Sequence, residues 1–132
     1  MTPEQIEETI RGGFPDDPDA ARIKVLGTDP MTLVLPFNAG MLRPGGTLSG
    51  PTLMKMADTA MWAAAMHVCD TSEGLFTSSL HIDFLRLPAA SDLIAVARVL
   101  KPGRRLVVGT VELRSRGDDR VVAHASVTYA RA

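Results

Sequence analysis

The chain has 132 residues and a net charge of -1, from 14 Lys plus Arg and 15 Asp plus Glu, and 45% of its residues are hydrophobic. This length predicts one domain over residues 1–132, and the composition predicts a packed core rather than disorder. The charge balance gives no general attraction to nucleic acid or to an acidic membrane surface. No apolar run approaches the roughly 20 residues that a membrane span needs.

The single cysteine, Cys69, rules out an internal disulfide framework. The first 20 residues are polar and acidic, unlike a secretory signal, so we expect a cytoplasmic protein. Cys69 and the three scattered histidines show no metal-ligand spacing, and the sequence therefore predicts no metal site.

The N-terminal half contains signals for two helices and a hairpin. Residues 3–12 predict a short helix with Thr2 as a possible cap. Residues 22–28 and 31–37 alternate weakly between apolar and polar positions and are joined by a turn, which predicts a hairpin. A glycine-rich loop then leads into an apolar helix over about 51–69.

The C-terminal half alternates with a period of two over 80–85, 94–99, 107–113 and 121–129, which predicts four strands. The turns between them are too short for crossover helices, so the strands are expected to be antiparallel. These elements predict an α+β fold in which a long central helix is wrapped by a curved antiparallel sheet of about five to six strands. The outer strands leave free edges, which favours self-association.

An acid stands in the middle of the apolar helix. At helical spacing, the neighbours of Asp58 on the helix surface include Met54, Met61 and Trp62. If this face is buried, Asp58 is a candidate reactive group. If the helix edge reaches water, Asp58 is simply solvated.

The start of the same helix has features of an anion-binding end. Ser49 or Gly50 can cap it, and Pro51 suits its first turn. Free backbone N–H groups point outward there, and a carbonyl can approach Gly50 closely because this residue has no side chain. Such an end can stabilise an oxyanion. Many helix starts look like this, so the signal is weak alone.

Two stretches, "GTLSGPTLMKMAD" and "LFTSSLHIDFLRL", resemble the hotdog-fold acyl-CoA thioesterases, in particular their phenylacetate-degradation (PaaI-like) branch. Gly46, Gly50 and Asp58 keep the register of that family's pattern, and Thr77 falls where a Ser or Thr often faces the acid. The resemblance covers residues 31–130.

The resemblance implies that Asp58 activates water or attacks the thioester directly, that the N–H of Gly50 polarises the thioester carbonyl, and that Thr77 helps to place the water. It also implies a homodimer with sites between the subunits, often paired into a dimer of dimers. No cofactor is implied, because coenzyme A is part of the substrate. Lys101, Arg104 and Arg105 match a basic turn that often lies near the coenzyme A nucleotide in the family. The alternative is that these residues form a solvated hairpin turn.

The chain departs from the family pattern before the helix. Ser49 replaces a His, Pro51 replaces a Gly, and Arg43 replaces an Asn. Arg43 either donates hydrogen bonds in place of the Asn or points into solvent. We expect four residues to bind substrate: Arg43 and Ser49 before the helix, and Thr59 and Trp62 beside Asp58 on the helix.

The function that the sequence favours is therefore an acyl-CoA thioesterase. The lost Asn and His leave a second hypothesis open, a non-catalytic acyl-CoA or lipid-binding hotdog protein. A hydratase is disfavoured because no histidine precedes His67. Small aromatic and medium-chain acyl groups both fit the sequence.

Overall fold

The computed structural model describes all residues, 1–132. It contains two α-helices, a short 3-10 helix and six strands: α1 (Pro3–Gly13), β1 (Lys24–Thr28), β2 (Met31–Leu35), η1 (Ala39–Met41), α2 (Gly50–Cys69), β3 (Leu75–Phe84), β4 (Leu93–Pro102), β5 (Leu106–Ser115) and β6 (Ala123–Arg131). Neither α-helix is long and apolar enough to cross a membrane.

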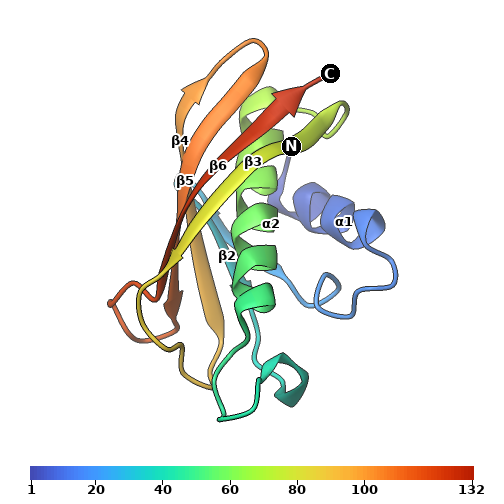
Figure 1. The fold of residues 1–132 in the computed structure, drawn as a ribbon. Helices are drawn as coiled ribbons and strands as arrows, with labels where there is room; N and C mark the ends of the chain where they lie inside the picture. The colour runs from blue at the N-terminus through green and yellow to red at the C-terminus, as the bar shows by residue number, and fades with distance from the viewer.

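The six strands form one antiparallel sheet in the order β1-β2-β4-β5-β6-β3. The sheet curves around α2, and α1 lies on the other side of that helix (Figure 1). The predicted α+β fold, a long helix wrapped by a curved antiparallel sheet, is confirmed. β3 begins at Leu75, earlier than the predicted start at 80, and lies at an edge of the sheet beside β6.

The packing of α2 explains its composition. Its sheet-facing surface consists largely of alanine and methionine, and most of these side chains are fully buried. Met61 lies directly over Gly109 of β5, where a Cβ would come within 2.7 Å of the Met61 sulfur. The missing side chain at Gly109 therefore makes room for Met61, and the buried alanines of α2 let the helix approach the sheet closely.

Both helices begin at a cap that the sequence predicts, Thr2 for α1 and, of the two candidates Ser49 and Gly50, Ser49 for α2. The Thr2 side chain accepts a hydrogen bond from the backbone of Gln5 and forms a capping box at the start of α1. Ser49 caps α2 by accepting from the backbone N–H of Thr52. α2 ends at Cys69, and the next residue, Asp70, caps it in a left-handed conformation.

Candidate functional site

Asp58 is half-buried in the middle of α2 and receives two hydrogen bonds on the same oxygen. The hydroxyl of Thr77 on β3 donates to Oδ1 at 2.7 Å. The phenol of Tyr129 on β6 also donates to Oδ1 at 2.7 Å and lies 3.1 Å from the backbone carbonyl of Asp58. The predicted contact between Thr77 and Asp58 is therefore present within one chain.

A β-bulge orients Thr77 toward the helix. The pairing of β3 with β6 shifts register between Thr77 and Ser79, so that Ser78 is the extra residue. If β3 alternated regularly, counting back from the inward-facing Leu80 would place Thr77 on the outward face, together with Ser79. Because the bulge adds one residue, Thr77 faces α2 instead and pairs directly with Tyr129 of β6.

Tyr129 is a site residue that the sequence analysis missed. It is the last of the inward-facing residues of β6 and is only 4% exposed. Burial raises the pKa of its phenol far above the ordinary value, and the negative charge of Asp58 adds to the effect. One signal was available, because a tyrosine on a buried strand face needs a partner for its hydroxyl.

The nearest cation on α2 is held away from Asp58. Lys55 lies one turn earlier, and its ammonium forms ion pairs with Asp19 at 2.7 Å and Asp17 at 3.1 Å. Partial burial raises the pKa of Asp19, but hydrogen bonds and charge from Lys55 and Arg22 outweigh it and hold this pKa below its ordinary value. Asp58 has no ion pair within the chain, and neutral hydroxyls are its hydrogen-bond donors.

Gly50 is not brought to Asp58 within one chain. As the first residue of α2, it has a backbone N–H with no acceptor inside the helix. Eight residues of helix separate it from Asp58, which is about 12 Å along the axis. The ring of Phe84, at the end of β3, lies over Gly50 at ordinary contact distance from where a Cβ would stand.

The expected substrate-binding residues near the helix are dispersed. Arg43 is exposed in the loop before α2, and its side chain makes no hydrogen bond or ion pair. The Ser49 hydroxyl is engaged in the cap of α2. Thr59 is buried, and Trp62 packs edge-to-face on Phe14 at 5.9 Å, on the α1 side of the helix.

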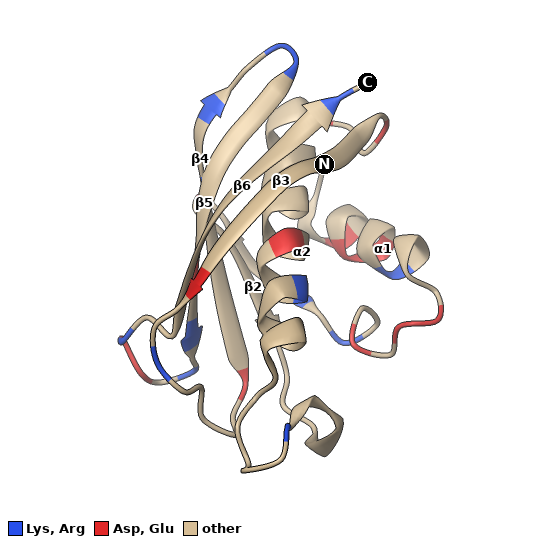
Figure 2. Ribbon diagram, viewed as in Figure 1, with Lys and Arg blue, Asp and Glu red and all other residues tan.

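The basic turn forms the tip of the β4–β5 hairpin, which is coloured for Lys and Arg in Figure 2. Lys101, Arg104 and Arg105 are exposed there. Strand pairing connects this tip to the site, because Thr77 pairs with Tyr129, Tyr129 with Val107, and Val107 with the last residue of β4. The basic tip thus lies at the same end of the sheet as the hydroxyls that hold Asp58.

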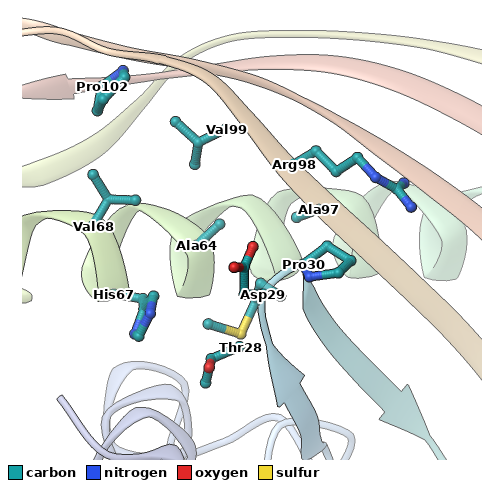
Figure 3. A pocket seen from close by; sticks show the side chains of 11 residues that line it. Thr28, Asp29, Pro30, Ala64, His67, Val68, Ala97, Arg98, Val99 and Pro102 are labelled. Carbon is teal, nitrogen blue, oxygen red and sulfur yellow. The ribbon is translucent and has the colours of Figure 1, made fainter.

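A cavity of about 510 Å³ lies elsewhere, between the β1–β2 turn, β4 and the C-terminal half of α2 (Figure 3). His67, Ala64 and Asp29 are among the residues that line it, and Asp58 is not. No group of three or more His, Cys, Asp or Glu side chains is placed to hold a metal ion. The candidate site is therefore defined by the hydrogen bonds of Asp58 rather than by an enclosed pocket.

Comparison with solved structures shows close likeness in fold. The chain is similar to zebrafish thioesterase superfamily member 2, with 21% identity and a TM-score of 0.83 over 100% of this chain and 99% of that chain. It is similar to a thioesterase family protein from Silicibacter pomeroyi, with 22% identity and a TM-score of 0.77 over 95% and 96% of the two chains. A conserved protein from Pseudomonas aeruginosa is 30% identical, with a TM-score of 0.68 over 77% and 80%.

No curated protein matches the chain. The family model of the thioesterase superfamily matches residues 45–122, more than half of the chain, and this range includes Gly50, Asp58 and Thr77. The chain therefore belongs to the thioesterase superfamily and has the hotdog fold.

Proposed function

We propose that the protein is an acyl-CoA thioesterase of the PaaI-like branch in which Asp58 acts as general base or nucleophile. Membership of the superfamily supports thioester hydrolysis in general. The observation that carries the proposal is the Asp58 carboxylate, half-buried and held by two hydroxyl donors. Gly46, Gly50 and Asp58 also keep the spacing of that branch.

The chemistry needs one free carboxylate oxygen. As a general base, Asp58 takes a proton from water while the water oxygen attacks the thioester carbonyl; the C–S bond then breaks and the thiolate takes up the proton. As a nucleophile, Asp58 attacks the carbonyl itself and the C–S bond breaks to release the thiolate, which takes a proton from solvent; water then hydrolyses the mixed anhydride and frees the Asp58 carboxylate. In both routes the carbonyl oxygen becomes negative and needs N–H donors.

The N–H donors for this oxygen are expected to come from a second copy of the chain. Gly50 and Asp58 of one chain lie too far apart to act on one carbonyl. β3 is an edge strand with one side unpaired, and antiparallel pairing with β3 of a second copy would set the Thr77 end against the Phe84 end. Because Phe84 covers Gly50, this pairing would carry the second copy's Gly50 toward Asp58. The proposal therefore includes a homodimer that can pair further into a dimer of dimers.

The substrate assignment is supported by charge. Coenzyme A carries phosphates on its nucleotide, and exposed guanidinium and ammonium groups bind phosphate well. Lys101, Arg104 and Arg105 supply such groups at the end of the sheet where Asp58 is held. A cytoplasmic location, where acyl-CoA is available and Cys69 stays reduced, belongs to the same proposal.

The test is a panel of acyl-CoA thioesters, from small aromatic to medium-chain, assayed by the free thiol released. A blank without substrate corrects for Cys69, the one free cysteine of the protein. Asp58→Asn should lower kcat by roughly a hundredfold or more. The matched control is Asp119→Asn, an exposed carboxylate in the turn before β6, which should behave as wild type.

Two results would overturn this function. One is wild-type protein that hydrolyses none of the thioesters; the other is Asp58→Asn protein that keeps full activity. Binding of acyl-CoA seen as a thermal shift, with no thiol released, would support a non-catalytic acyl-CoA-binding protein instead.

A further inference from the structure

The phenol of Tyr129 is the least expected part of the site. Tyr129 lies 71 residues after Asp58, on the last strand, and outside the range that the family model matches. It stands between Thr77 of β3 and Val107 of β5, and its hydroxyl faces α2. Asp58 is the one charged group to which it is hydrogen-bonded.

The two oxygens of Asp58 are not equivalent. Thr77 and Tyr129 both donate to Oδ1, each at 2.7 Å, whereas no group of the chain donates to Oδ2. The only buried side-chain polar atom without a hydrogen-bond partner is Nε of Arg22, so Oδ2 is not sealed inside the protein. Oδ1 is therefore anchored, and Oδ2 is the oxygen with free lone pairs at the surface.

We infer that Tyr129 is a positioning residue: its phenol, with the hydroxyl of Thr77, anchors Oδ1 of Asp58 and presents Oδ2 to the reacting water or thioester. This inference rests on the proposed function. The single phenol proton reaches both Oδ1 and the backbone carbonyl of Asp58, which also fixes the side chain relative to the helix. Hydrogen bonds to a charged acceptor are about twice as strong as those between neutral groups.

The phenol can only donate in this role. Burial raises the pKa of Tyr129 well above its ordinary value of 10.0, and the Asp58 charge raises it further. A phenol with a pKa above 10.0 keeps its proton at neutral pH. It holds the carboxylate without competing as a base, so the reactive proton transfer is left to Oδ2.

The first test is kinetic. Tyr129→Phe removes the hydroxyl and keeps the ring, so kcat should fall about tenfold while KM stays within about twofold, because a misaligned carboxylate slows the chemistry without changing substrate contacts. The control is Thr128→Val, which removes a hydroxyl from the neighbouring position of β6, on the other face of the sheet. Its kcat and KM should equal those of wild type.

The second test needs no activity, because Tyr129 is the only tyrosine of the chain and its phenolate can be followed by absorbance. Asp58→Asn removes the charge next to the phenol, so the titration midpoint should fall to a lower pH. Thr128→Val should leave the titration curve unchanged. Circular dichroism at each pH identifies the range in which the protein stays folded.

The outcomes separate this inference from the proposed function. The inference fails alone if Asp58→Asn is inactive while Tyr129→Phe has wild-type kcat. It also fails if Asp58→Asn leaves the phenol midpoint unchanged. If the midpoint falls but wild-type protein releases no thiol, the contact is real and the proposed function fails, together with any role of Tyr129 in it.

Discussion

The Asp58 carboxylate is held by hydroxyls rather than by a cation, and this choice has a chemical consequence. A close lysine or arginine would stabilise the charge and make the carboxylate a weaker base. Lys55 is near enough on the helix surface to do so, but Asp17 and Asp19 bind its ammonium on the other flank. Thr77 and Tyr129 therefore fix the orientation of Asp58 without a cation paired to it.

Thr77→Val should lower kcat by roughly tenfold to a hundredfold, because the isosteric side chain cannot donate to Oδ1 and a hydrogen bond to a charged group contributes roughly 1.5–3 kcal/mol. Thr77→Ser keeps the hydroxyl and is the matched control, with activity within about threefold of wild type. Steady-state thiol release checks both variants. Equal activity of the Val and wild-type proteins would show that the Thr77 contact has no part in the reaction.

The site residues differ in how far the sequence could predict them. Asp58 and Thr77 were predicted from helix position and from the spacing of the family pattern. Strict alternation alone places Thr77 on the face away from the helix. The bulge at Ser78, which turns Thr77 toward the helix, has no local signal in the sequence. Tyr129 was missed because its contact with Asp58 depends on which strand pairs with β3, a long-range property of the sheet.

Among the elements, the loop between α1 and β1 is tied to α2 by charge. Asp17 and Asp19 pair with Lys55, and Asp19 also pairs with Arg22, whose guanidinium donates to the backbone carbonyl of Pro36. These side chains are partly buried, so they are screened less than exposed pairs. The network fixes the segment after α1 against the middle of α2.

Asp19→Asn should reduce the free energy of unfolding by about 1 kcal/mol near neutral pH. The pKa of Asp19 is lowered in the folded protein, so its stabilisation is present above the ordinary value of 3.8 and is lost as the pH falls through the folded value below it. The pKa of Lys55 is raised, so the alkaline loss begins only above its ordinary value of 10.5. Urea unfolding followed by Trp62 fluorescence measures the difference.

Asp16→Asn is the control for this prediction, because Asp16 is exposed in the same loop and has no ion pair. The gap between wild type and Asp19→Asn should be constant from about pH 5 to 9 and should close in acid. A gap that persists at pH values well below the folded pKa of Asp19 would mean that the substitution acts through packing instead of charge.

The strands and helices themselves were largely predictable. Period-two alternation indicated β4, β5 and β6, and the apolar run with its Ser-Gly-Pro start indicated α2. The start of β3 at Leu75 was missed because Thr77, Ser78 and Ser79 are polar and the bulge interrupts the alternation. The order of strands, with β3 at the edge beside β6, depends on tertiary packing and has no local signal.

At the scale of the whole molecule, the edge formed by β3 and its following segment is exposed and apolar. Four large side chains there are at least half exposed: Phe76 54%, Phe84 51%, Leu85 57% and Leu87 76%. An unpaired edge strand beside such a surface is a template for pairing with another chain. The same edge carries Thr77 at one end and covers Gly50 at the other, so dimerisation and completion of the site are expected to be one event.

The decisive measurement is thiol release by a purified heterodimer of Asp58→Asn and Gly50→Pro chains, isolated with two affinity tags. Gly50→Pro removes the N–H at the first helical position, where proline is tolerated, and Gly50→Ala, which keeps the N–H, is its control. Each variant alone should be nearly inactive. The heterodimer should recover about half of wild-type activity, because one of its two sites takes an intact Asp58 and an intact Gly50 from different chains. An inactive heterodimer, or full activity in Asp58→Asn alone, would contradict a thioesterase site shared between two copies.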